Sequence, residues 1–280
     1  MTEKEPTLTG LDTQEETLQK TVGTGARLDL TLSVIRGSFA SNDIPKVKEY
    51  IQKADKELEK GGDWERKNKL RVYKGLLAVT LRDFKTAADL FIASLATFTP
   101  CEMLSFRDYV LYTIITSLIA LDRTTLKSTI LESPEILSVV GEIPHLREFV
   151  TALYECRYKR FFESFVGVID EMRSDKYLSH HLRYITRAVR LVAYKQFLLS
   201  YKSVTIEMMA HAFGVAPEFI EEELSAFISA GKLHCKIDRI NKYVESNRLA
   251  DPRNALYAKV LKQGDLLLNR IQKLSRVIDV

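Results

Sequence analysis

The clearest local pattern lies at residues 205–246, which read TIEMMAHAFGVAPEFIEEELSAFISAGKLHCKIDRINKYVES. A short helix is predicted over residues 205–213, a turn follows at Gly214, and a second helix with an apolar face is predicted over 217–230. After these helices, apolar residues alternate with polar ones, as in short strands that bury one face. The strand residues are Leu233, Cys235 and Ile237, then Tyr243 and Val244. Two helices joined by a turn and followed by a two-stranded wing predict a winged helix.

The second helix of this pattern is acidic, which bears on whether the winged helix reads DNA. Between Thr205 and Gly231 there is no Lys or Arg, so this helix would be repelled by phosphates. The acidic residues are Glu207, Glu218, Glu221, Glu222 and Glu223. Direct binding of nucleic acid by this helix is therefore not expected.

Positive charge clusters elsewhere in the chain, whose formal net charge is +4. Basic residues gather at 66–71, at 157–160 and along 231–280. Two interpretations stay open for these clusters. They are solvated helix faces, or they are surfaces complementary to an acidic protein neighbour.

The chain before the winged helix is predicted to be a stack of helical hairpins. Apolar residues recur at three- and four-residue spacing from Leu28 onward, which is the period of amphipathic helices. The stretch 70–100 also has the spacing of a tetratricopeptide-like hairpin, in which small residues let two helices approach and aromatic residues fill the space beside them. Its marker residues are Gly75, Phe84, Ala87, Phe91 and Pro100.

The segment Gly61-Gly62-Asp63-Trp64 is predicted to be a structural break between helix pairs. The glycines end one helix, and the Asp63 carboxylate is expected to accept hydrogen bonds from the first N–H groups of the next. The indole of Trp64 is expected to pack inside this break. Its removal would then cost ~3–5 kcal/mol, as for other buried aromatic side chains.

A long helix is predicted to end the chain, from about residue 254 to 278. Its apolar residues follow a 3-4 spacing, which forms a heptad seam. The helix either folds back on the winged helix as core, or joins a bundle with helices of other chains, because such a seam needs a partner along its length. The seam residues are Tyr257, Val260, Gly264, Leu267, Ile271, Leu274 and Ile278.

Composition places the chain in the globular class, since 46% of its 280 residues are hydrophobic and 28% are charged. The longest apolar run, 109–121, is interrupted by polar residues and is shorter than the ~18 residues of a membrane span. No contact with a membrane is therefore expected. The N-terminus has no signal-peptide pattern, so cytoplasmic and nuclear localisation is expected.

No grouping of residues predicts catalysis, a cofactor or a metal site. The cysteines are too far apart for a CxxC pattern, and His180 and His181 would point ~100° apart on a helix. His234 and Cys235 are neighbours on a predicted strand, so they face opposite sides. Motifs for nucleotide binding and for serine hydrolysis are absent. The cysteines are Cys101, Cys156 and Cys235.

The predicted fold class is mainly α: stacked helical hairpins, then a winged helix with a small β wing, then a long C-terminal helix. The predicted divisions are a flexible lead-in over 1–27, a helical-repeat domain over 28–201, a winged helix over 202–250 and an assembly helix over 251–280.

This layout resembles the PCI domain, found in the proteasome lid, the COP signalosome and a translation-initiation factor. Within that group the chain most resembles the lid's non-ATPase subunit-seven family, also called regulatory subunit six. Five blocks carry the resemblance. They are GGDWERKNKLRVYKGLLAV from Gly61, RDFKTAADLF from Arg82, LYECRY from Leu153, AFGVAPEFIEEELSAFISAGKLHCKID from Ala212 and KQGDLLLNRIQKLSRVI from Lys262.

The resemblance implies a non-catalytic subunit of the proteasome regulatory particle lid, which supports ATP-dependent degradation of ubiquitinated proteins. It implies edge-to-edge contacts with other PCI subunits at residues 233–246 and a helical bundle at 257–278. The ATPase ring is a further candidate partner. Members of this family have a longer N-terminal repeat, which residues 1–27 do not match.

Two alternatives stay open. One is a PCI scaffold subunit of the signalosome or the initiation factor. The other is a nucleic-acid-associated winged-helix adaptor that uses the basic tail, whose binding would weaken steeply with added salt.

Overall fold

The computed structural model describes residues 17–18, 20–59, 63–98, 103–246 and 252–278. It divides into two units, Met1–Val192 and Ala193–Val280. The division falls inside a helix, Leu182–Ser200, which the sequence places at the end of the helical repeat. The predicted domain boundaries stay predictions.

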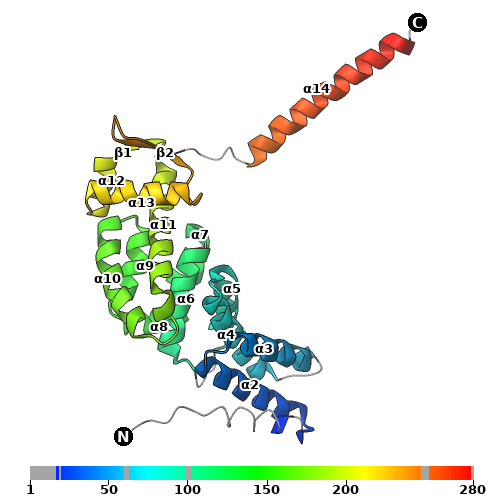
Figure 1. Ribbon diagram of the computed structural model, residues 1–280, viewed down its shortest axis with the longest axis vertical. Helices are drawn as coiled ribbons and strands as arrows, with labels where there is room; N and C mark the ends of the chain where they lie inside the picture. The colour runs from blue at the N-terminus through cyan, green and yellow to red at the C-terminus, as the bar shows by residue number, and fades with distance from the viewer. Residues whose placement is uncertain (1–16, 19, 60–62, 99–102, 247–251, 279–280) are drawn as a thin grey trace. The chain divides into compact units, whose positions relative to one another are not determined.

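The first unit is built from helices (Figure 1). Their lengths and order follow the predicted amphipathic segments. They are α2 (Thr24–Ala40), α3 (Ile44–Glu59), α4 (Trp64–Thr80), α5 (Phe84–Leu95), α6 (Phe106–Ala120), α7 (Arg123–Leu126), α8 (Pro134–Val139), α9 (Leu146–Tyr154), α10 (Tyr158–Ser174) and the first part of α11 (Leu182–Ser200), whose residues from Ala193 onward belong to the second unit.

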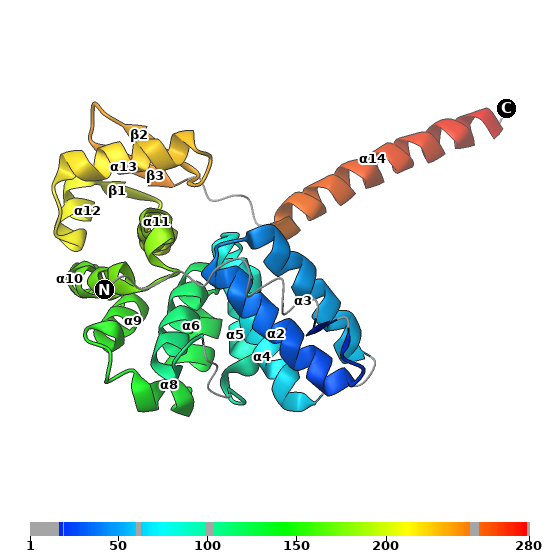
Figure 2. The ribbon, with the colours of Figure 1, turned by 60° about the horizontal axis from the view of Figure 1, so that its bottom comes forward.

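Sequential helices of this unit pack as hairpins. The pairs α2 with α3, α4 with α5 and α9 with α10 lie against each other, and α5 also packs on α6 (Figure 2). The prediction of stacked hairpins is confirmed. Two stretches of this unit are irregular: α7 continues as a π-helical turn, Lys127–Leu131, and a 3-10 turn, Ser179–His181, precedes α11.

The hairpin of α4 and α5 has the predicted close contact between a glycine and an aromatic ring. A Cβ atom built on Gly75 would lie 2.4 Å from the Phe91 ring. Phe84, Ala87 and Phe91 are all buried, and the Phe91 ring meets Tyr109 of α6 edge-on at 5.5 Å. The absent side chain at Gly75 is therefore what lets α4 approach α5 at this point. Pro100, the predicted end of the hairpin, lies outside the described residues.

The predictions for Asp63 and Trp64 are wrong in their details. Asp63 does occupy the N-cap position of α4, but its side chain makes no capping hydrogen bond. Its carboxylate lies instead 3.9 Å from the guanidinium of Arg66. The Trp64 side chain is 56% exposed, with the guanidinium of Arg71 5.6 Å from its ring centroid. Gly61 and Gly62 lie outside the described residues.

We therefore expect Trp64→Ala to lower the free energy of unfolding of the free chain by less than ~1 kcal/mol, because the indole covers little of the core. Trp64 is also the only tryptophan of the chain, so its fluorescence reports its exposure directly. Acrylamide should quench that emission readily in the folded protein. A loss of ~3 kcal/mol in urea unfolding, or an emission shielded from acrylamide, would show that the indole is buried.

The second unit contains the predicted winged helix and the long C-terminal helix. The helices of the winged helix follow the predicted segments closely. Its elements are β1 (Ser203–Thr205), α12 (Ile206–Phe213), α13 (Pro217–Ser229), β2 (Cys235–Asp238) and β3 (Tyr243–Ser246), with α14 (Pro252–Ile278) after them.

Local sequence signals explain the ends of α12 and α13. The Thr205 side chain accepts a hydrogen bond from the Met208 N–H at 3.3 Å, which caps α12. Gly214 ends that helix in the left-handed region at φ 70°, and Pro217 sits in the first turn of α13. The prediction of a helix-turn-helix is confirmed.

The sheet differs from the predicted two-stranded wing. It has three antiparallel strands in the order β1-β3-β2. The extra strand, β1, pairs Val204 with Val244. Strand β3 is therefore the central strand, so within the edge contact expected at 233–246 the part over Tyr243–Ser246 is wrong: both sides of this strand are already paired. The edge strands of the described sheet are β1 and β2.

The C-terminal helix runs without a break over the predicted seam. At ~1.5 Å per residue its 27 residues extend about 40 Å. No helix in the described part of the chain combines the length and hydropathy that crossing a membrane requires.

Candidate functional site

The side chains of the predicted wing contact divide between the core and the surface. Leu233, Cys235 and Val244 are buried, and burial raises the pKa of the Cys235 thiol. Ile237 and Tyr243 are partly exposed. The buried side chains build the winged helix itself, so a partner at this strand would meet mainly backbone groups.

The turn between β2 and β3 is held by Asp238. Its carboxylate accepts hydrogen bonds from the backbone N–H of Ile240 at 2.9 Å and from the side chain of Asn241 at 3.0 Å. These hydrogen bonds lower the pKa of Asp238, and the bond from the Asn241 side chain has the largest effect. The charge of Asp238 in turn raises the pKa of Tyr243. The turn thus presents the Ile240 side chain to solvent.

Two carboxylates of the acidic helix α13 have partners within the unit. Glu223 accepts a hydrogen bond from the Tyr194 hydroxyl at 2.6 Å, and Glu221 pairs with Arg239 of the turn at 2.8 Å. These contacts hold α13 to α11 and to the wing. The helix still offers no cation of its own to a phosphate.

Sequence reasoning missed the groove beside β1, because three residues are too few to give a periodic signal. The groove has a volume of about 420 Å³. Its residues are Lys202, Ser203, Val204, Thr205, Tyr243 and Glu245. The β-branched pair Val204-Thr205 was the available signal. The winged helix therefore has a second candidate edge for a partner strand.

The second candidate surface is the apolar stripe of α14. We use this name for the six apolar seam residues other than Gly264, whose side chains are 56–75% exposed. They are Tyr257, Val260, Leu267, Ile271, Leu274 and Ile278. A Cβ on Gly264 would meet nothing within 4 Å. Leu261 and Leu268 widen the stripe and are equally exposed. A continuous exposed apolar surface of this kind is typical of a binding site for another protein.

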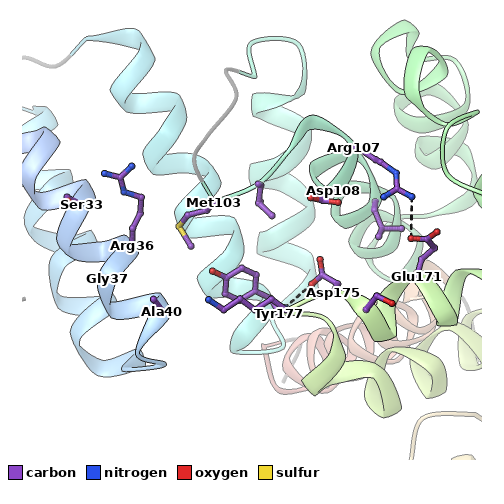
Figure 3. Close-up of a pocket in the computed structure, with 14 residues that line it drawn as sticks. Ser33, Arg36, Gly37, Ala40, Met103, Arg107, Asp108, Glu171, Asp175 and Tyr177 are labelled. Atoms are coloured by element: carbon purple, nitrogen blue, oxygen red, sulfur yellow. Dashed lines mark hydrogen bonds and ion pairs between the residues drawn. The ribbon is translucent and has the colours of Figure 1, made fainter. Parts of the chain in front are cut away.

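A polar hollow of about 800 Å³ lies in the first unit among α2, α6 and the end of α10 (Figure 3). Arg107 pairs with Glu171 across it at 3.3 Å. Asp175 accepts hydrogen bonds from the Tyr177 backbone and from the Tyr112 hydroxyl. Burial, and then the charge of Asp175, raises the pKa of Tyr112. These charged groups satisfy one another, so the hollow has the character of a structural junction.

The histidines form no metal centre in the described residues, where no three potential metal ligands gather. The Nδ1 atom of His181 accepts a hydrogen bond from Arg82 Nε at 3.4 Å, and burial lowers the pKa of His181. His180 and His234 are exposed.

Family comparisons cover most of the chain. The model for 26S proteasome subunit RPN7 matches residues 8–129, the PCI domain model matches 167–248, and the model for the RPN7/PSMD6 C-terminal helix matches 257–278. The PCI match agrees with the winged helix and confirms the predicted fold class.

The chain is 51% identical over 278 residues to a 26S proteasome non-ATPase regulatory subunit 6 from Oryza sativa, covering 99% of this chain and 70% of the relative. A homologue of that subunit from Arabidopsis thaliana is 52% identical over 261 residues, covering 93% and 67%. A COP9 signalosome complex subunit 1 from Arabidopsis thaliana is 27% identical over 240 residues, covering 85% and 54%.

These matches correct one expectation. The RPN7 model begins at residue 8 and the rice alignment covers 99% of the chain, so the N-terminal segment does match the family. The chain belongs to the RPN7/PSMD6 family of 26S proteasome regulatory subunits.

Proposed function

We propose that the chain is a non-catalytic structural subunit of the proteasome regulatory particle lid, which supports ATP-dependent degradation of ubiquitinated proteins. The observation that carries the proposal is the apolar stripe of α14, which is exposed along its length and lies in the segment that matches the family's C-terminal helix. Its partners would be other PCI subunits at the winged-helix edges and a bundle of lid C-terminal helices. The ATPase ring is a further candidate partner, and the place of action would be the cytoplasm and the nucleus.

Mass spectrometry of the complex purified with the native, tagged chain tests this function. We expect proteasome lid and ATPase subunits in stoichiometric amounts. A complex made of signalosome subunits instead would overturn the proposal.

The hydrogen-bond pattern of the sheet shows how a partner strand could add to it. The Ser246 N–H donates to the Lys202 carbonyl and the Ile206 N–H donates to the Lys242 carbonyl, each at 2.9 Å. Even-numbered residues of β3 therefore bond toward β1. Because antiparallel strands alternate, the odd-numbered residues bond toward β2.

The outward groups of β2 follow from its register. Lys236 lies opposite Glu245, so its N–H points toward β3. The N–H groups of Cys235 and Ile237 then point away from the sheet. We propose that these two groups pair with the edge strand of a neighbouring PCI subunit.

We expect Ile237→Pro to weaken incorporation into the lid about two- to tenfold, the range for one lost hydrogen bond, because it removes an outward donor and leaves the ladder intact. The measurement is quantitative mass spectrometry of lid assembled from the variant. Lys236→Pro is the control, since it removes a ladder bond and should lower the melting temperature of the free chain. If the Ile237→Pro chain is incorporated into the lid to the same extent as the wild-type chain, pairing at β2 is excluded. The edge strand to test is then β1.

A further inference from the structure

One face of α4 combines an exposed indole with two cations. Trp64, Lys67 and Arg71 are spaced by three and four residues, so at ~100° per residue they lie within an arc of about 60°. The guanidinium of Arg71 lies over the Trp64 ring, 5.6 Å from its centroid. Lys67 is exposed. We call these three residues the α4 patch.

The other cations of this helix are already paired. Arg66 bonds Asp29 at 2.8 Å, Lys69 bonds Glu65 at 2.7 Å and Lys74 bonds Asp55 at 2.6 Å. The bond to Arg66 lowers the pKa of Asp29, as expected for a paired carboxyl. Within the described ranges, Lys67 and Arg71 have no carboxylate partner. The α4 patch therefore presents two positive charges that no carboxylate of the described residues pairs, beside an exposed apolar ring.

We propose that the α4 patch binds an acidic segment of a neighbouring protein subunit. A carboxylate of that segment lies between Lys67 and Arg71, and an apolar side chain beside it covers the Trp64 indole. Trp and Arg are the side chains that most often dominate protein interfaces, and charge complementarity selects an acidic partner. That the neighbour is a subunit of the same particle rests on the proposed function.

A nucleic acid fits this surface less well. Its binding relies on several cations along the phosphate backbone, about 6–10 in a typical protein complex. The α4 patch offers two, and the neighbouring cations are held by carboxylates that would repel phosphates. A short acidic peptide needs only these two charges and gains the contact with the ring.

Zero-length cross-linking of the purified native particle tests the proposal. A carbodiimide joins a lysine amine to a carboxylate that touches it, and peptide mass spectrometry then identifies both residues. We expect Lys67 joined to an Asp or Glu of another subunit. A link only to a carboxylate of this same chain would overturn the proposal. The absence of any cross-link at Lys67 would also overturn the proposal.

A charge reversal supplies the second measurement. We expect Lys67→Glu with Arg71→Glu to reduce incorporation about tenfold, and Trp64→Ala to reduce it severalfold, with the melting temperature of each free chain unchanged. The matched control is Lys48→Glu with Lys85→Glu, which changes the net charge equally at two exposed lysines outside the basic clusters. Equal incorporation of the two double variants would overturn the proposal.

The two proposals fail in different ways. If the wild-type chain does not purify with a proteasome particle, the proposed function fails. If it does purify with the particle and Lys67 has no partner carboxylate there, only the assignment of the α4 patch fails.

Discussion

Changing Leu267, Ile271 and Leu274 together to Asp abolishes incorporation of the chain into the regulatory particle and leaves the melting temperature of the free chain within about 2 °C of wild type. The three side chains lie on the apolar stripe of α14 and are more than half exposed, so the free chain loses almost no burial. In a bundle each would contribute ~1.5–3 kcal/mol, or ~4.5–9 kcal/mol together before the cost of ordering is subtracted. Quantitative mass spectrometry and circular dichroism melting measure the two effects.

The control places the same substitution on the opposite side of the same helix. Lys262, Asn269 and Lys273 are exposed and, at ~100° per residue, lie opposite the apolar stripe, so changing all three to Asp should leave assembly within about twofold. A triple variant of the stripe that melts far below wild type would identify α14 as core of its own unit. That result would favour the alternative in which the helix folds back on the winged helix.

Periodicity predicted the elements of this protein well and the surroundings of single side chains poorly. The helix-turn-helix at 206–229 and the hairpin of α4 and α5 were predictable because repeated apolar residues must share a buried face. Strand β1 is only three residues long, so it gives no period. Its pairing with β3 is a long-range contact, and that contact alone makes β3 the central strand.

Trp64 is a second case in which the local sequence did not determine the surroundings of a side chain. An aromatic residue after a helix break is buried in many proteins, and here it stands at the exposed start of α4. The exposure of a side chain at a helix end depends on how the neighbouring helices pack, and the local sequence pattern does not contain that information. For α14 the period gave the stripe correctly but not its partner, because a heptad seam looks the same whether its own chain or another covers it.

Gly75→Ala should lower the free energy of unfolding by about 1–3 kcal/mol, although Ala is the better helix former. The new Cβ would lie 2.4–2.9 Å from three atoms of the Phe91 ring, which is fully buried. That ring also meets Tyr109 and Tyr112 edge-on, so it has little room to move aside. The melting temperature should fall by about 2–4 °C per kcal/mol, measured by circular dichroism.

A double-mutant cycle separates this overlap from a general intolerance of α4. Phe91→Leu alone should destabilise the chain, because it removes part of a buried ring. In the Phe91→Leu background, however, the Cβ added by Gly75→Ala no longer overlaps an aromatic ring. The substitution should then be neutral, or should stabilise the chain by up to ~1 kcal/mol through the higher helix propensity of Ala. The coupling between the two sites, which is the difference between the effects of Gly75→Ala in the two backgrounds, should then be about 1–4 kcal/mol. Gly264→Ala is the matched control, since a Cβ there meets nothing within 4 Å and only the propensity gain remains. If Gly75→Ala costs the same in the Phe91→Leu background as in the wild-type chain, the close approach of α4 to α5 does not depend on this pair.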